Sequence, residues 1–196
     1  MKAPKTRTAS NAGANRLRII GGQWKRTRLK VADKPGLRPT PDRVRETLFN
    51  WLGQDLGGWR CLDAFAGTGA LGLEAASRGA TQVLMVENDG QLVAQLDALQ
   101  IKLGAEAVRV QRGDGLHTLR SATPGGWDVV FLDPPFEAAF YAQVLSAAAQ
   151  AITATGYVYL EAPIAWAEAD LAALGLAPHR YLKAGAVHAH LLRRAG

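Results

Sequence analysis

Short apolar runs alternate along the chain with longer segments in which apolar residues recur every three or four positions. The short runs predict strands that begin at Cys61 and cover 82–87, 108–112, 127–132 and 157–161, with a final pair at 179–184 and 187–193. The longer segments predict helices at 71–78, 90–103, 137–152 and 166–174. Strands joined by helical crossovers indicate an α/β fold, in which ligands bind at the carboxyl ends of the strands.

The segment before these strands has a pattern of its own. Residues 17–20 and 24–31 flank Gly21 and Gly22 and predict a β-hairpin with one basic and one apolar face. The basic face suits RNA phosphates, and Trp24 suits stacking on a base, although the same side chain would equally anchor the hairpin to the domain. The RNA contacts expected here are Arg18, Trp24, Lys25, Arg26, Arg28 and Lys30.

Residues 37–52 predict a further helix. Thr40 suits its N-cap, Pro41 its first position and Asp42 the positive end of its dipole. The polar face of this helix carries Arg43, Glu46, Thr47 and Asn50. This face can close over a ligand, line an RNA path or face solvent. We add Arg38 and Arg43 to the expected RNA contacts.

Positive charge is concentrated at the start of the chain. Residues 1–45 contain 13 Lys or Arg and two acids, a net charge of +11 within a total of +6. Such an arm favours a polyanionic partner, with a solvated tail as the alternative. The 196 residues, 48% of them hydrophobic, suffice for one main domain. We expect a disordered basic tail at 1–15, a basic hairpin appendage at 16–36 and the α/β domain at 37–196.

Gly67, Gly69 and Gly72 join the first of these strands to the helix that follows it. Glycines let the backbone approach a ligand, and the start of the helix offers N–H groups, so this loop predicts a nucleotide-type cofactor site. Glu87 ends the next strand, where an acid binds ribose. Asp63 suits a ligand with cationic or N–H groups, such as the amino acid end of S-adenosylmethionine. The cofactor contacts that we expect are Asp63, Phe65, Gly67, Thr68, Gly69, Glu87, Asn88, Asp114 and Gly115.

Asp114 allows two interpretations. It follows the strand 108–112, where it can accept a hydrogen bond from an adenine amino group or stabilise a turn.

The sequence Asp133-Pro134-Pro135-Phe136 follows the strand 127–132. Its prolines donate no hydrogen bond, so the backbone carbonyls and the Asp133 carboxylate offer acceptors only. Acceptors on an exocyclic amine of guanine or adenine raise the electron density of its nitrogen and aim the lone pair at a sulfonium methyl group. Phe136 can stack on the base. We expect these four residues to be catalytic.

Together, these motifs resemble those of S-adenosylmethionine-dependent methyltransferases that act on amino groups. More specifically, residues 37–52 and the stretch LDAFAGTGALGLEAASRGA at 62–80 are similar to the bacterial RsmD family, and the likeness spans 16–193. The resemblance implies a Rossmann-like class I methyltransferase fold, with a seven-stranded, mostly parallel sheet and helices on both faces. It also implies methylation of guanine N2 in 16S (small-subunit) ribosomal RNA. We expect this RNA to be bound within a small-subunit particle, with naked RNA as the alternative substrate.

Other functions remain open at this stage. An adenine-N6 DNA methyltransferase would use the same Asp-Pro-Pro-Phe corner. A nicotinamide-dependent oxidoreductase would use the glycines and Glu87 but not this corner. A non-catalytic RNA-binding protein would use only the basic arm.

The remaining features bear on location and metals. The single cysteine, Cys61, cannot form an internal disulfide and suits a buried thiol in a reducing cytoplasm. No apolar run approaches the ~18 residues of a membrane span, so we expect a cytoplasmic protein without a membrane partner. We also expect a monomer. His188 and His190 share a strand face without Cys or acidic company, so we expect no metal site.

Overall fold

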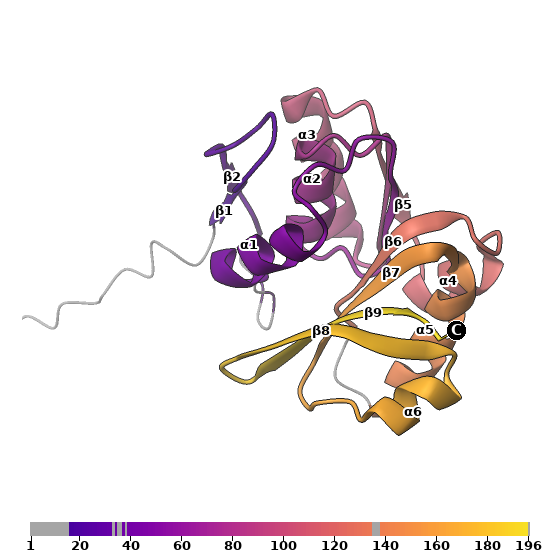
Figure 1. Ribbon diagram of the computed structural model, residues 1–196. Helices are drawn as coiled ribbons and strands as arrows, with labels where there is room; N and C mark the ends of the chain where they lie inside the picture. The colour runs from indigo at the N-terminus through magenta and orange to yellow at the C-terminus, as the bar shows by residue number, and fades with distance from the viewer. Residues whose placement is uncertain (1–15, 33, 35–36, 38, 135–137, 196) are drawn as a thin grey trace, which may run out of the picture.

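The computed structural model describes residues 16–32, 34, 37, 39–134 and 138–195. The predicted tail at 1–15, Arg38, Pro135 and Phe136 lie outside these residues. The described chain forms a sheet covered by helices on both faces, with a separate small hairpin packed beside it (Figure 1).

The sheet has seven strands, and six of them run in the same direction. They are β3 (Arg60–Asp63), β4 (Gln82–Glu87), β5 (Val108–Arg112), β6 (Trp127–Leu132), β7 (Ile152–Ala162), β8 (Leu176–Ala184) and β9 (Val187–Arg194). Their order is β5-β4-β3-β6-β7-β9-β8, and β9 is antiparallel to both neighbours. The order reverses between β3 and β6, where the connections leave toward opposite ends of the sheet and open a crevice. This arrangement confirms the predicted seven-stranded, mostly parallel sheet.

Side chains alternate between the two faces of the sheet and build two cores. Cys61, Val129 and Phe131 belong to one core, and their neighbours Leu62 and Val130 belong to the other. The first core is covered by α1 (Asp42–Trp51), α2 (Ala70–Ser77) and α3 (Gly90–Leu103). The second is covered by α4 (Gly115–Ser121), α5 (Ala138–Ala151) and α6 (Glu168–Ala173). Among the described helices, none is both long and apolar enough to cross a membrane.

The predicted N-terminal hairpin is present. Its strands β1 (Arg16–Arg18) and β2 (Arg28–Lys30) pair antiparallel, with Leu17 opposite Leu29. Both leucines are buried in the first core, at about 1.5–3 kcal/mol of stabilisation for each side chain, while the flanking cations stay exposed. The strands are shorter than expected because residues 21–26 fold into a turn, in which the Lys25 amide donates to the Gly22 carbonyl.

One buried carboxylate ties this hairpin to two helices. Glu74 of α2 accepts hydrogen bonds from the backbone amides of Ile20 and Gly21 at 2.9 and 2.7 Å. It also pairs with Arg45 of α1 at 3.1 Å and with Arg78 at 2.9 Å. Glu74 is fully buried and Arg45 is 1% exposed. The hydrogen bonds and ion pairs of Glu74 therefore fix the positions of the hairpin and α1 relative to the sheet.

Some element boundaries differ from the prediction. Helix α1 has Pro41 as its N-cap and begins at Asp42; Thr40 makes no capping hydrogen bond, because its hydroxyl binds Glu161 instead. Strand β7 begins at Ile152 and passes through Gly156, where a register shift against β6 accommodates the glycine. The short helix α4 was not predicted, since its seven residues carry little periodic signal. Helix α6 is shorter than the predicted 166–174.

Candidate functional site

Five neighbouring strands bring a carboxylate to the same edge of the sheet. In sheet order, these are Asp114 after β5, Glu87 on β4, Asp63 on β3, Asp133 after β6 and Glu161 on β7. All five line one cavity of about 820 Å³, a volume typical of small-molecule sites. Among its described lining residues there is no Lys, Arg or His. The cavity therefore favours a ligand with positive charge or N–H donors over an anion.

The glycine loop shows why glycine is needed at two of its positions. Gly67 and Gly69 have φ of 51° and 78°, in the left-handed region that other residues avoid. A Cβ on Gly69 would also lie 2.6 Å from Leu96 of α3. Gly67 lines the cavity, whereas Gly69 is the N-cap of α2 and is not among the lining residues. The loop therefore contacts the cavity through Gly67 and its neighbour Thr68.

Glu87 holds this loop in place. Its Oε2 accepts a hydrogen bond from the Gly67 amide and its Oε1 accepts one from the Asp89 amide, both at 2.9 Å. Each carboxylate oxygen has a second lone pair, so Glu87 keeps acceptor capacity for the hydroxyls of a ribose. Asn88, the next residue, is exposed and also lines the cavity.

Asp63 is buried under the start of α2. It is 2% exposed, and its Oδ2 accepts a hydrogen bond from the Gly72 amide at 2.9 Å. Burial raises the pKa of Asp63 to about 7, despite backbone hydrogen bonds that lower it. A carboxylate therefore already occupies the position near the helix start where a dinucleotide would place its pyrophosphate.

Asp114 and Gly115 line the cavity and also have structural roles. Asp114 is the N-cap of α4, and its Oδ1 accepts a hydrogen bond from the His117 amide at 2.6 Å. A Cβ on Gly115 would lie 2.1 Å from the Ala64 carbonyl oxygen, so this contact requires glycine. Phe65 lies opposite, in an edge-to-face contact with Phe140, with 5.8 Å between ring centroids.

Asp133 and Glu161 form a pair at the other end of the cavity. Because Leu132 of β6 pairs with Leu160 of β7, the residues that follow them lie on adjacent strands at the same level. Burial raises the pKa of Asp133, and the nearby charges of Glu161 and Asp63 raise it further. Burial also raises the pKa of Glu161, against hydrogen bonds from Thr40 and Tyr159. Pro134 lines the cavity beside Asp133.

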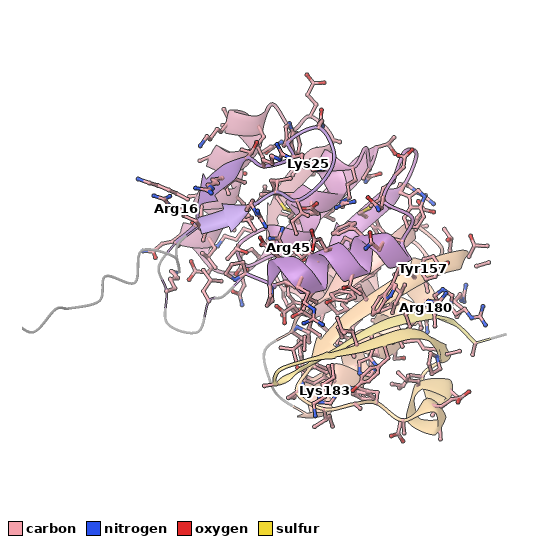
Figure 2. The ribbon with its side chains drawn as sticks, turned by 60° about the vertical axis from the view of Figure 1, so that its left-hand side comes forward. Arg16, Lys25, Arg45, Tyr157, Arg180 and Lys183 are labelled. Atoms are coloured by element: carbon pink, nitrogen blue, oxygen red, sulfur yellow. The ribbon has the colours of Figure 1, made fainter. Side chains whose placement is uncertain are left out.

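The predicted RNA contacts that the structure describes lie outside this cavity. Those of the hairpin are exposed except Trp24, which is half-buried against the first core and whose amide donates to Ser77 Oγ at 3.0 Å. Arg18 pairs with Asp42 at 2.6 Å. Arg43 is exposed, and none of the four polar residues predicted on α1 lines the cavity. In Figure 2, Arg16 lies at the outer edge of the hairpin, whereas Arg45 lies within the molecule.

Among the lining residues that the sequence analysis did not assign to the site are Glu161, Thr40 and Val187. Glu161 had a usable signal, since it is an acid at the end of a predicted strand. Thr40 had been assigned to a helix cap. Val187 lines the cavity from the start of β9, so the β8–β9 hairpin borders the cavity. Lys183 lies on the same hairpin (Figure 2). Tyr181, which is 49% exposed, is also on β8.

Comparison with known proteins matches the chain to one family over most of its length. The sequence profile of the family described as Conserved hypothetical protein 95 matches residues 17–193. A relative named Ribosomal RNA small subunit methyltransferase D, from Escherichia coli strain K12, is 48% identical over 128 residues, which cover 65% of this chain and 64% of the relative. One of the same name from Haemophilus influenzae is 43% identical over 133 residues, covering 66% and 69%.

The fold is similar to that of a solved structure. The putative methyltransferase yhhF from Escherichia coli superimposes with a TM-score of 0.79 at 34% identity, covering 91% of this chain and 98% of that chain. This similarity confirms the predicted methyltransferase fold.

Proposed function

The chain belongs to the RsmD family, described as Conserved hypothetical protein 95, and from this premise we propose that it transfers a methyl group from S-adenosylmethionine to N2 of a guanine in 16S ribosomal RNA. The observation that carries the proposal is the row of carboxylates along one sheet edge, in a cavity without a described cation. The relatives named Ribosomal RNA small subunit methyltransferase D support the choice of RNA.

The residues present fit the cofactor. Glu87 offers acceptors for the ribose hydroxyls, and Asp114 and Asn88 lie beside it for the adenine. Asp63, the Gly67 loop and Thr68 face the end that carries the amino acid. Positive charge on the ligand would offset the desolvation that raises the pKa of Asp63. A nicotinamide dinucleotide carries negative phosphates and fits this set of acids poorly.

Asp133 and Pro134 suit the acceptance of an amine. S-adenosylmethionine, when bound, supplies a methyl group on a positively charged sulfur. The Asp133 carboxylate and the Pro134 carbonyl accept hydrogen bonds from the N–H groups of the target amine. These hydrogen bonds orient the lone pair of its nitrogen. The nitrogen must lose one proton as it gains the methyl group, and Asp133, whose pKa is raised, is placed to take it. Phe136 would stack on the base, as the sequence predicts.

RNA would bind on the cationic surfaces beside the cavity opening. The hairpin offers Lys25, Arg26, Arg28 and Lys30, all exposed. The β8–β9 hairpin, whose Val187 lines the cavity, adds the exposed Lys183. We further propose that the substrate is a small-subunit particle, because a base in folded RNA must be presented outside its helix to enter such a cavity. We also propose that the protein acts as a monomer in the cytoplasm.

Two measurements test the proposal. Calorimetry should show binding of S-adenosylmethionine and not of NAD. Incubation with 16S ribosomal RNA and with small-subunit particles, followed by nucleoside mass spectrometry, should show N2-methylguanosine. Formation of N6-methyladenosine instead would favour the adenine enzyme, and cofactor binding without transfer to either substrate would reject the proposed activity.

A further inference from the structure

Glu161 is a carboxylate at this edge of the sheet to which the proposed function assigns no role, in binding either the cofactor or the target amine. The β6–β7 register places it beside Asp133, on strands about 4.8 Å apart. Both residues line the cavity, and Glu161 is 5% exposed. It therefore lies next to the group that would hold the target amine.

Two hydroxyl groups hold one oxygen of Glu161. Its Oε1 accepts hydrogen bonds from Thr40 Oγ1 at 2.8 Å and from Tyr159 Oη at 3.0 Å. Within the described residues, no hydrogen bond falls on Oε2. Oε2 is not one of the fully enclosed unpaired atoms of the described residues, and Glu161 lines the cavity, so this oxygen is accessible to a donor that arrives with a ligand.

Tyr141 of α5 carries a buried polar group that lacks a partner within the described chain. The Tyr141 hydroxyl has no hydrogen-bond partner among the described residues, and Tyr141 is 3% exposed. Burial raises the pKa of Tyr141 to about 12, and the charges of Asp133 and Glu161 contribute to this rise. Glu161 Oε2 in the cavity and the buried Tyr141 hydroxyl therefore both lack a hydrogen-bond partner among the described residues, as expected where the polar edge of a ligand completes the hydrogen bonding.

We propose that Glu161 recognises the Watson–Crick edge of the target guanine by accepting a hydrogen bond from N1–H, next to the N2 amine held by Asp133. This inference rests on the proposed function and adds the residue that selects the base. Guanine presents two adjacent donors, N1–H and N2–H, which match two adjacent carboxylates. Adenine presents a lone pair at N1, which a carboxylate repels, so Glu161 also excludes the adenine alternative.

A merely structural role for Glu161 makes a different prediction. If Glu161 only anchors Thr40 and hence α1, its loss should lower the rate for every base alike. The matched controls are Thr40→Val and Tyr159→Phe, which each remove one hydrogen bond to Oε1 and leave the carboxylate in place. Both controls should lower the rates together and leave the ratio between bases unchanged.

The experiment first maps, with the unmodified protein, the guanine methylated in 16S ribosomal RNA. Splinted ligation then places guanosine or 2-aminopurine riboside at that position; both carry the 2-amino group, but 2-aminopurine has a lone pair at N1. The unmodified protein should prefer guanosine at least about a hundredfold, the scale for leaving a charged acceptor without its donor. Glu161→Gln, whose amide can donate to that lone pair, should reduce this preference at least about thirtyfold.

Each outcome decides between the possibilities. A preserved preference in Glu161→Gln, with cofactor affinity intact, would overturn the role of Glu161 while leaving the proposed function standing. Absence of guanine methylation by the unmodified protein would overturn the proposed function, and this inference with it. If Glu161→Gln loses cofactor binding, Glu161→Asp replaces it: the shorter acid withdraws from the cavity and should also reduce the preference, and a preference equal to that of the unmodified protein would count against the inference.

Discussion

Glu87 and Gly67 share a hydrogen bond of 2.9 Å, in which the glycine amide in the loop after β3 donates to the carboxylate at the end of β4. The other oxygen of Glu87 accepts from the Asp89 amide, at the start of α3. One side chain therefore fixes the glycine loop and the entry to a helix, and still faces the cavity.

This relationship makes Glu87→Ala a test of the cofactor site. The substitution removes acceptors for ribose hydroxyls, at about 1.5–3 kcal/mol for bonds to a charged group, and should weaken S-adenosylmethionine binding roughly ten- to a hundredfold. Calorimetry measures the affinity, and Glu106→Ala, at an exposed position, serves as control. An affinity equal to that of the unmodified protein would reject the assignment.

Asp133→Ala separates action on the amine from cofactor binding. We expect cofactor affinity to stay within a fewfold, while single-turnover methyl transfer falls by about two orders of magnitude or more, the scale for losing a preorganised polar group. Rapid-quench measurement with saturating cofactor gives the rate. Parallel losses of affinity and rate would place Asp133 in the cofactor site instead.

The buried Asp63 makes stability depend on pH. Its folded-state pKa of about 7 exceeds the ordinary value of 3.8, so between these values the folded protein holds a proton that the unfolded chain has released. The free energy of unfolding should therefore fall as pH rises from about 4 to 7 and, for this group, level off above 7. Asp63→Asn should abolish this pH-dependent contribution, on the order of 4 kcal/mol, measured by urea denaturation without cofactor. Parallel pH curves for the two proteins would contradict the assignment.

The ion pair of Arg45 with Glu74 predicts that replacing an arginine of α1 with methionine lowers stability much more at position 45 than at position 43. Arg45→Met leaves a buried carboxylate with fewer partners and should cost about 3 kcal/mol, the lower end of the range for a broken buried pair, because Arg78 and two hairpin amides remain. Arg43→Met, at an exposed position, should change stability by about 0.5 kcal/mol or less. Denaturant titration compares them. Equal losses would mean that the pair is not a structural anchor.

The hairpin cations should determine how RNA binding depends on salt. If about four to six phosphates are neutralised, log affinity should fall with log salt at a slope near −3 to −4, and replacing Lys25, Arg26, Arg28 and Lys30 with alanine should flatten it by up to about 3 units. Cofactor affinity should not change. The matched control replaces four exposed cations on other elements, namely Lys102, Arg109, Arg120 and Arg194.

Filter binding across a salt series gives both slopes. A hairpin variant that retains the original slope, or a control variant that flattens it equally, would show that the hairpin does not form the RNA path. The exposed face of α1 would then be the next candidate.

The sequence predicted the sheet and four of the five carboxylates at its edge because both depend on local signals. Strand β4 and helix α3 were placed to the residue, since an apolar run ends at Glu87 and the helix lies between the cap Asp89 and the stop signal Gly104. The acids Asp63, Glu87 and Asp114 follow from the rule that parallel strands deliver their last residues to one edge.

What sequence reasoning missed depends on contacts between distant residues. The hydrogen bond from Thr40 to Glu161 joins residues 121 positions apart, so a local capping rule assigned Thr40 a different role. Arg45 lies on a helix whose polar residues mostly face solvent, and its inward position depends on the buried carboxylate of Glu74 together with Asp42 and the Thr40 carbonyl. Local spacing carries no sign of either contact.

The position of β9 has a consequence for how the chain is synthesised. It is the last strand in the sequence, yet it lies between β7 and β8 and pairs with both. During translation, β7 therefore keeps an open, apolar edge until residues 187–194 have left the ribosome. A chain that ends before Val187 would retain that open edge, which can pair with strands of other molecules and lead to aggregation.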